Sequence, residues 1–332
     1  GRVVTELGAE GVNIALGRSP LLSDIAGYIS TQCAELNYII GRPGIPLGRV
    51  TLFFGLEGSA KSTLAYHVMA EVQRLGGVAV LFDTERRFSR DRAERIGLNL
   101  DDLIMVQTST LEGCFHATEK VIKLLRDGQE DIPVVVVWDS LTAAVPEKVE
   151  KGEDVQLGLA ARIVSSRLPL LTSRLADTKA ALIIVNQVRD YISTDTRSKE
   201  RRKLMGQHHA MIAERSVGYY NSLALFFSSL GVDDKDDPTA IDVRATAKKV
   251  SISYGEGRSC EFRVRYWDGI DKERSKLSLL ERLGIVKRTG SWYGIDGLDQ
   301  KFQRKDFGAI LSANPTLETI IAEAPLLWLE GK

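Results

Sequence analysis

The sequence of 332 residues has few of the side chains from which disulfide frameworks and metal sites are built. Its three cysteines, Cys33, Cys114 and Cys260, lie far apart and show no Cys-x-x-Cys spacing. We therefore expect reduced thiols rather than a zinc or redox site. The four histidines form no His-Glu-x-x-His pattern, which gives a protein-built transition-metal site little support.

Long apolar runs and a dominant sign of charge are also missing. No stretch approaches the roughly 18 apolar residues of a membrane-spanning helix, and no basic start followed by an apolar core indicates a signal peptide. We expect a cytoplasmic protein without a membrane partner, and a trimmed chain, since it begins with Gly1. Lys and Arg together number 44, as do Asp and Glu, which excludes a diffuse polycation. The hydrophobic fraction of 44% excludes wholesale disorder.

Four short apolar runs, each ending in a polar or glycine-rich segment, predict strands buried on both faces of a parallel sheet. They cover residues 50–54, 78–82, 134–138 and 182–185. Between them, apolar residues recur at helical spacing over residues 64–75, 114–125 and 158–175. This alternation predicts an α/β fold, with a mostly parallel sheet and helices on both faces.

The pattern changes near residue 240. Two runs, 241–254 and 261–267, are separated by Gly255-Glu-Gly-Arg258 and predict an antiparallel hairpin at the sheet edge. Beyond residue 270, helical stretches around Ser291-Trp-Tyr293 predict a small α+β domain. We expect a short N-terminal segment at 1–29, a core domain at 30–269 and a small C-terminal domain at 270–332.

The strongest motif is Gly55-Leu-Glu-Gly-Ser-Ala-Lys-Ser-Thr63, which nearly matches G-x-x-x-x-G-K-[ST] between a strand and a helix. In that motif, backbone N–H groups cradle phosphates, the lysine offsets their charge and the serine hydroxyl binds Mg²⁺. Ala60 replaces a glycine, and we expect the phosphate to be held if the backbone there remains helical. The alternative is a tight turn with an incidental Lys-Ser. The expected contacts are Gly55, Glu57, Gly58, Ser59, Ala60, Lys61, Ser62 and Thr63.

Polar residues follow the other three predicted strands. Asp139 suits the role of a carboxylate that holds Mg²⁺ through water. Glu85 suits the role of a carboxylate that accepts a proton from the attacking water, and Gln187 suits the role of a sensor of the γ-phosphate. The alternatives are a helix N-cap, a solvated acidic turn and a polar strand exit. Because the carboxyl ends of parallel strands share one edge, we expect these side chains to converge with Lys61 on one nucleotide.

A basic segment follows Gln187. Residues 189–203 hold six basic against three acidic side chains and show little apolar periodicity. The segment predicts a loop whose charges suit the phosphates of a nucleic acid backbone, with a solvated charged loop as the alternative.

Together these segments resemble the RecA-type homologous-recombination ATPases of bacteria and phages, including phage UvsX-like recombinases. The resemblance covers roughly residues 29–315 and is carried by motifs in the order and near the spacing of that family. They are Ile29-Ser-Thr31, the segment 44–55, Phe82-Asp-Thr-Glu85, Val137-Trp-Asp-Ser140, Gly158-Leu-Ala-Ala-Arg162, Ile184-Val-Asn-Gln-Val-Arg189 and Gly290-Ser-Trp-Tyr293. It implies a RecA-like P-loop ATPase core followed by a small C-terminal domain.

The resemblance also implies residue roles. Glu85, Lys61 and Gln187 become catalytic residues, and Ser62 and Asp139 hold Mg²⁺, Asp139 through water. Segments 146–158 and 189–219 resemble two DNA-binding loops. The implied DNA contacts are Arg162, Arg189, Lys199, Arg201, Arg202, Lys203 and Tyr219. Lys248 and Lys249 would reach the ATP of the neighbouring subunit, and Arg92 stands where the family stacks a tyrosine on adenine.

Some segments depart from the family. Ala213-Glu-Arg215 replaces a Gly-Gly-Asn in the second loop. The segment before Ile29 is shorter than in the family and does not show the pattern of a long basic helix. Since the family uses such a helix to dock on the next subunit, we expect polymerisation to use another element. An acidic tail at the C-terminus is missing as well.

The implied function is an ATP-dependent DNA recombinase with ATP and Mg²⁺ as cofactors. It would form helical filaments on single-stranded DNA and catalyse homologous pairing and strand exchange with double-stranded DNA in recombination and repair. Its partners would be both DNA forms, further copies of itself, and single-strand-binding and loader proteins. The alternatives are a RecA-fold hexameric motor or helicase, and a catalytically inactive recombination mediator.

Overall fold

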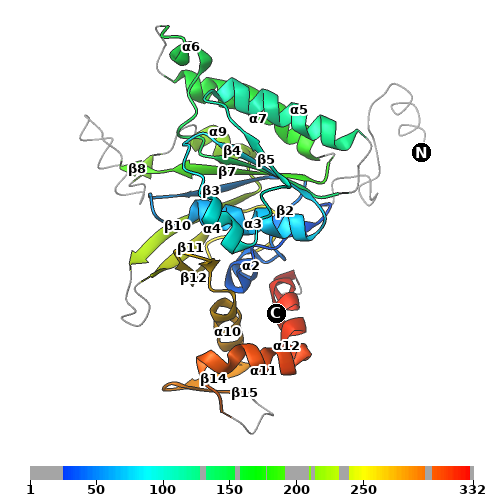
Figure 1. Cartoon of the computed structure of the whole chain (residues 1–332), viewed down its shortest axis with the longest axis vertical. Coiled ribbons are helices and arrows are strands. Elements are labelled where there is room, and N and C mark those ends of the chain that lie inside the picture. Colours follow the sequence, from blue (N-terminus) through cyan, green and yellow to red (C-terminus); the bar gives the residue numbers. More distant parts are fainter. Residues whose placement is uncertain are drawn as a thin grey trace.

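A nine-stranded sheet forms the centre of the protein (Figure 1). The structure is a computed structural model and describes residues 25–127, 132–153, 158–176, 178–190, 209–210, 214–231, 239–295 and 301–329. The strands run in the order β13-β12-β11-β10-β3-β7-β6-β4-β5. Their bounds are β3 (Val50–Gly55), β4 (Val78–Asp83), β5 (Leu103–Val106), β6 (Val134–Asp139), β7 (Ala180–Gln187), β10 (Leu223–Gly231), β11 (Ala240–Val250), β12 (Ser259–Arg265) and β13 (Gly269–Ile270). The strands from β10 to β5 are parallel, and β11, β12 and β13 continue the sheet in antiparallel pairs.

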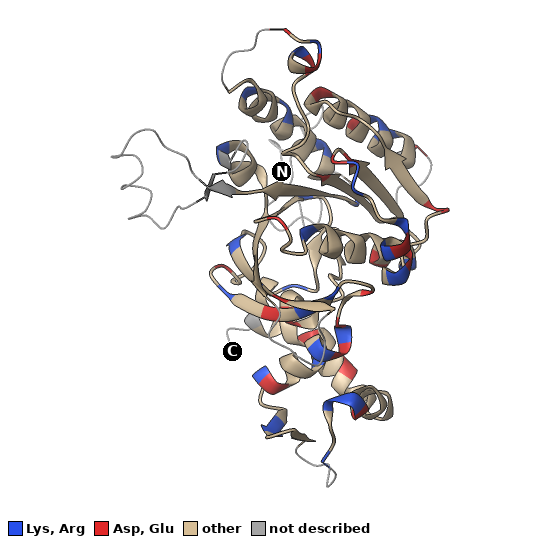
Figure 2. Cartoon of the chain, turned by 60° about the vertical axis from the view of Figure 1, so that its left-hand side comes forward, with Lys and Arg blue, Asp and Glu red and all other residues tan. Residues whose placement is uncertain are grey.

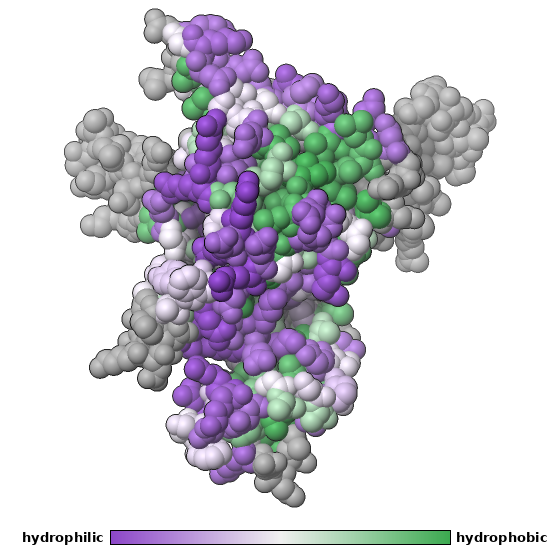
Figure 3. Space-filling view, viewed as in Figure 1, coloured by the Kyte–Doolittle hydropathy of each residue, from purple (hydrophilic) through white to green (hydrophobic). Residues whose placement is uncertain are grey.

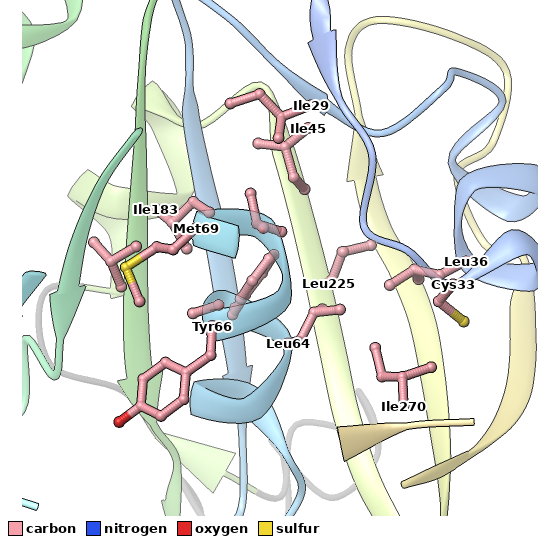
Figure 4. Packing of buried hydrophobic residues seen from close by; sticks show 14 of the residues in the cluster. Ile29, Cys33, Leu36, Ile45, Leu64, Tyr66, Met69, Ile183, Leu225 and Ile270 are labelled. Atoms are coloured by element: carbon pink, nitrogen blue, oxygen red, sulfur yellow. The ribbon is translucent and has the colours of Figure 1, made fainter. Parts of the chain in front are cut away.

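Helices cover both faces of this sheet. One face carries α2 (Ala34–Ile40), α3 (Lys61–Arg74) and α4 (Arg90–Ile96), and the other carries α5 (Leu111–Arg126), α7 (Leu159–Ala176) and α9 (Glu214–Tyr220). Because successive strand residues point to opposite faces, Phe53 packs in the first core and Leu52 in the second. Figure 4 shows Tyr66 and Met69 of α3 packed in the first core near Ile183. The predicted α/β fold with a mostly parallel sheet is confirmed.

Shorter elements complete the core. They are β1 (Tyr28–Ile29), β2 (Ile45–Pro46), α6 (Glu147–Glu150), β8 (Arg189–Asp190) and β9 (His209–Ala210). Strands β1 and β2 pair with each other, as do β8 and β9. Among the described residues, no helix is both long and apolar enough to span a membrane.

The elements after β13 gather around an apolar cluster of their own. They are α10 (Lys272–Arg282), β14 (Val286–Thr289), β15 (Trp292–Ile295), η1 (Arg304–Asp306), α11 (Phe307–Ala313), α12 (Pro315–Glu323) and η2 (Ala324–Leu329). The cluster includes Leu280, Phe307 and Leu317, and Tyr38 of α2 packs against it. In Figure 2, basic and acidic residues are intermixed along these elements and along the core helices. The division of the chain near residue 270 stays a prediction.

Several sequence-based boundaries and elements need correction. The predicted strand 261–267 is observed as β12, which begins at Ser259 and ends at Arg265. The predicted strand 241–254 ends at Val250, because the chain turns there and Ser251 N donates to Ser222 O at 2.8 Å. Strands β5 and β10 were not predicted. Strand β5 is a short edge strand, and its Ile104 and Met105 are 37% exposed (Figure 3 shows apolar side chains over this part of the sheet).

Candidate active site

The register of the parallel strands brings the carboxyl ends of four strands to one edge of the sheet. Gly55 at the end of β3 is the register partner of Gln187 at the end of β7, and Asp83 at the end of β4 is the partner of Asp139 at the end of β6. Helix α3 begins at this edge with Lys61. A cavity of about 320 Å³ lies there, and Lys61, Glu85, Asp139 and Gln187 line it together. It is also lined by Glu57, Gly58, Ser59, Ala60, Ser62, Thr63, Tyr66, Asp83, Arg87, Ser89, Arg92, Ile241 and Tyr266.

The loop between β3 and α3 depends on left-handed backbone conformations. Gly55 has φ +155°, and a Cβ atom there would lie 2.1 Å from Phe227 O, so only glycine fits. Gly58 has φ +73°. Ala60, the residue before α3, has φ +64° and ψ +19°. The condition stated for Ala60, a backbone that remains helical, is therefore not met, because Ala60 adopts the left-handed conformation, which costs an L-residue about 1–2 kcal/mol.

Lys61 folds its side chain back along this loop. Its Nζ donates to Gly55 O at 3.0 Å, to Leu56 O at 2.6 Å and to Ser59 Oγ at 3.2 Å. The residue is only 6% exposed, and burial lowers the pKa of its ammonium to about 8, although nearby Asp139 and Glu85 act in the opposite direction. The ammonium therefore remains mostly protonated at neutral pH, and an added anion would favour its charged form further.

Asp139 and Ser62 form the neighbouring polar pair. Burial raises the pKa of Asp139 to about 6, and the carboxylates of Glu85 and Asp83 act in the same direction. The hydrogen bond with Ser62 and the charge of Lys61 partly offset this rise. Among the described residues no helix begins at Asp139, since the next one, α6, begins eight residues later at Glu147, so this aspartate does not act as an N-cap.

Glu85 is oriented by donors at the ends of two other strands, since Gln187 ends β7 and Ser140 directly follows β6. Its Oε1 accepts from Gln187 Nε2 at 2.7 Å and from the hydroxyl of Ser140. Its Oε2 lies 3.6 Å from Arg87 Nη1, which also contacts Glu57 Oε1 at 2.6 Å. With its side chain only 16% exposed, Glu85 differs from a solvated acidic turn. A carboxylate held in this way can orient a water molecule and accept its proton.

Gln187 is itself fixed by the loop after β6. Its backbone N–H donates to Thr142 Oγ1 at 3.0 Å, and the Thr142 hydroxyl donates to Asn186 Oδ1 at 2.7 Å. Thr84 joins the ends of β4 and β6, since its hydroxyl donates to Ser140 O at 2.7 Å. Side chains therefore link the ends of three neighbouring strands, and the backbone of Gln187 is held while its amide group faces Glu85.

Magnesium and a nucleoside triphosphate fit this set of residues. Mg²⁺ is usually bound by one or two carboxylates together with substrate phosphates. Here Asp139 supplies one carboxylate, and the Ser62 hydroxyl beside it supplies a further oxygen. The N-terminus of the 14-residue helix α3 and the buried ammonium of Lys61 suit the phosphates. The wall formed by Ile241 and Tyr266 offers apolar surface for a base.

Several site residues were missed by the reasoning from sequence. Ser140 directly follows Asp139, so its position after a buried strand was an available signal. Tyr66 was expected only as a part of the helical pattern in 64–75, yet it lines the cavity. Ile241 lies in the antiparallel strand β11, and Tyr266 directly follows the antiparallel strand β12. Their position at the cavity depends on how β11 and β12 fold beside α3. No local sequence pattern indicates it.

The predicted DNA contacts are placed only in part. Arg162 lies on α7 and Tyr219 on α9, two helices that pack together and are joined by a hydrogen bond between Ser165 and Ser216. Tyr219 is 83% exposed. Arg189 lies in β8, two residues after Gln187. Lys199, Arg201, Arg202 and Lys203 lie outside the described residues.

The two lysines of β11 do not line the cavity. Lys249 Nζ donates to Gly218 O at 2.8 Å and to Tyr219 O at 3.1 Å, at the C-terminal end of α9. Lys248 Nζ lies 5.9 Å from the centroid of the Phe226 ring. Within one chain, neither lysine contributes to the site described above.

Comparison with known proteins agrees with this arrangement. Residues 5–264 match the RecA N-terminal domain family. The chain is 30% identical to Protein RecA of Chloroherpeton thalassium over 292 residues, which cover 87% of this chain and 77% of that protein. It is 32% identical to Protein RecA of Syntrophus aciditrophicus, with 87% and 80% covered. For Protein RecA of Chlorobaculum tepidum the identity is 31%, with 91% and 84% covered.

Proposed function

Because the chain belongs to the RecA family, whose members are DNA recombinases, we propose that it hydrolyses ATP with Mg²⁺ and uses that cycle for strand exchange in recombination and repair. One observation carries the proposal of hydrolysis. The cavity at the sheet edge joins a phosphate-binding loop and lysine to a carboxylate that is oriented by two donors. Phosphate binding alone does not require Glu85, whereas hydrolysis needs a group that positions water.

Each residue has a distinct part in this proposal. The N–H groups at the start of α3 and the ammonium of Lys61 hold the phosphates of ATP. Ser62 and Asp139 hold Mg²⁺, which neutralises charge on the phosphates when it is bound. Glu85 accepts the proton of the water whose oxygen bonds to the γ-phosphorus, while the bond to the ADP oxygen breaks. Gln187 donates its amide N–H to the γ-phosphate.

We place the single-stranded DNA along the surface of α7 and α9 that carries Arg162 and Tyr219. Tyr219 is exposed enough to stack on a base, and stacking combined with cationic side chains suits binding without sequence preference. Arg189 and the basic residues up to Lys203 supply the charges for the phosphates. Their nearness to Gln187 in sequence supports a link between ATP and DNA.

Filament formation is supported by the edge strand β5. A strand at a sheet edge leaves backbone groups unpaired on one side, and the exposed Ile104 and Met105 add apolar surface beside them. We propose this edge as a contact between copies of the chain. In the filament, Lys248 and Lys249 would extend from β11 toward the nucleotide of the neighbouring copy.

The test is ATP turnover with and without single-stranded DNA, combined with electron microscopy in the presence of an ATP analogue. We expect DNA to stimulate turnover, Lys61→Ala to lower it by at least about 100-fold, and the wild type to form helical filaments. The matched control is Lys120→Ala, which removes an exposed lysine of α5 and should leave turnover unchanged.

The other outcomes identify the alternatives. Closed rings in place of helical filaments would indicate a hexameric motor. Absence of turnover both with and without DNA, with no effect of Lys61→Ala, would indicate a catalytically inactive mediator.

A further inference from the structure

The turn that follows Glu85 carries two arginines, Arg86 and Arg87, in different positions. Both are exposed, but of the two only Arg87 lines the cavity at the sheet edge. Lys61 lines the same cavity from the start of α3. Arg87 therefore adds a cation on the side of the cavity where the carboxylate of Glu85 lies.

The side chain of Arg87 joins this turn to the phosphate-binding loop. Its Nη1 donates to Glu57 Oε1 at 2.6 Å and lies 3.6 Å from Glu85 Oε2. The first distance is that of a hydrogen bond, whereas the second is too long for one. The backbone of the turn is held separately, because the N–H groups of Arg87 and Phe88 donate to the Asp83 carboxylate, each at 3.1 Å. The guanidinium can therefore change partner while the turn stays in place.

The ion pair between Arg87 and Glu57 is easily exchanged. The two side chains are 66% and 70% exposed, and an ion pair of such exposure contributes little to stability because water and salt screen it. A phosphate group carries more negative charge than a carboxylate and offers several oxygen atoms to the planar fork of a guanidinium. A nucleotide phosphate in this cavity would therefore compete with Glu57 for Arg87.

We infer that Arg87 is a further catalytic residue, which leaves Glu57 when ATP binds and donates to the γ-phosphate held by the same chain. The inference rests on the proposed function, because it concerns hydrolysis at the same site. Water that attacks the γ-phosphorus lies between Glu85 and the phosphate, since reacting atoms approach to about 3–3.5 Å. Because Arg87 Nη1 lies 3.6 Å from Glu85 Oε2, rotation of its long side chain brings it to the phosphate oxygens.

The charge of Arg87 would act in the step that transfers the phosphoryl group. The water oxygen bonds to the γ-phosphorus, its proton passes to Glu85, and the bond from phosphorus to the ADP oxygen breaks. Negative charge is spread over the phosphoryl and leaving oxygens during this exchange, and guanidinium donors stabilise it. Arg87 belongs to the chain that holds the nucleotide, so its contribution needs no neighbouring copy, unlike the one proposed for Lys248 and Lys249.

The first test compares Arg87→Ala with the wild type in ATP turnover and in the equilibrium affinity for the slowly hydrolysed analogue ATPγS, with Mg²⁺. We expect kcat to fall at least about 10-fold, but less than the roughly 10²- to 10³-fold loss of a donor in a closed site, because the side chain is exposed. The affinity should change less than about threefold, since the contact with the phosphate replaces the contact with Glu57. Arg87→Lys should keep part of the rate, because it retains the charge but not the fork.

Substitution of Glu57 gives a readout that a merely structural role of Arg87 would not produce. Glu57→Gln removes the group that competes with the phosphate, so it should raise kcat/KM about two- to fivefold, the range expected from the loss of an exposed ion pair. The same substitution made in Arg87→Ala should leave kcat/KM unchanged. An equal effect in both backgrounds, including no effect in either, would overturn the exchange of Arg87 between Glu57 and the phosphate.

The matched control is Arg86→Ala, which removes the same charge from the adjacent position of the turn. Arg86 is exposed and does not line the cavity, and its φ of +55° is occupied by an L-residue before and after the substitution. Both kcat and the affinity for ATPγS should equal those of the wild type. Circular dichroism verifies that all variants fold.

The outcomes separate this inference from the proposed function. Wild-type kcat in Arg87→Ala, or an equal loss in Arg86→Ala, would overturn the role of Arg87 and leave the proposed hydrolysis intact. Absence of ATP turnover in the wild type, both with and without single-stranded DNA, would overturn the proposed function itself.

Discussion

The left-handed conformation of Ala60 leads to a stability prediction. Replacing Ala60 with glycine removes the Cβ atom that makes φ +64° unfavourable at the start of α3. We expect Ala60→Gly to raise the free energy of unfolding, although glycine usually destabilises a protein when it replaces alanine. The sign of the effect depends mainly on the backbone conformation, and the loss of the methyl group, which packs against the first core, opposes it.

The magnitude follows from two opposing contributions. An L-residue in the left-handed region costs about 1–2 kcal/mol, which glycine avoids. Glycine increases the conformational entropy of the unfolded chain, which costs about 0.4–1 kcal/mol. The net gain should be about 0.5–1 kcal/mol. The matched control is Ala309→Gly at an exposed position in α11, where the right-handed helix makes the same substitution cost about 0.5–1 kcal/mol.

Urea unfolding followed by circular dichroism measures both variants against the wild type, without nucleotide and with Mg²⁺ omitted. The two midpoints should move in opposite directions. If Ala60→Gly lowers the midpoint as Ala309→Gly does, the left-handed conformation of Ala60 carries no strain, and our reasoning about this loop is refuted.

Three further predictions concern catalysis, assembly and pH. Glu85→Gln should lower ATP turnover by about 10²- to 10⁴-fold, because it removes the group that accepts the proton of water. The affinity for a slowly hydrolysed ATP analogue should change less than about threefold, and a loss of that affinity would contradict a catalytic role. Met105→Lys should shift filaments toward single subunits in electron micrographs at unchanged circular dichroism, and unaltered filaments would exclude the β5 edge as the contact. Burial lowers the pKa of His67 from 6.5 to about 3, so the unfolded chain binds more protons between those values and stability falls as the pH drops. The loss from pH 7 to 5 should be about 2 kcal/mol by urea unfolding, and His67→Gln should remove it; equal losses in both proteins would contradict this.

The parallel part of the sheet was predictable because its strands carry strong local signals. The run 134–138 is continuously apolar and is followed by Asp139. The observed strand β6 covers the same residues and is longer by Asp139 alone. The position of the polar residues that follow these strands was also predictable, because the carboxyl ends of parallel strands lie at one edge of the sheet. Their convergence needed topology but no knowledge of side-chain packing.

Other parts of the site depend on contacts between distant segments, which local sequence patterns do not reveal. Strand β10 pairs with β3 on one side and β11 on the other, and its second half, from Ser228 to Gly231, lacks the continuous apolar pattern of the other central strands. Ile241 and Tyr266 reach the cavity only because β11 and β12 follow β10 in the sheet. The left-handed conformation of Ala60 also escaped prediction, because alanine favours a right-handed helix.

On the proposed mechanism, the amide group of Gln187 has two acceptors to choose between. In the structure it donates to Glu85 Oε1 at 2.7 Å, and the γ-phosphate would compete for the same group. Turning toward the phosphate leaves Glu85 with the hydroxyl of Ser140 and frees an acceptor for water. Arg189 follows Gln187 by two residues, at the start of the basic segment for which we propose DNA binding. On this mechanism, a single amide group would connect the state of the nucleotide to the carboxylate that orients water.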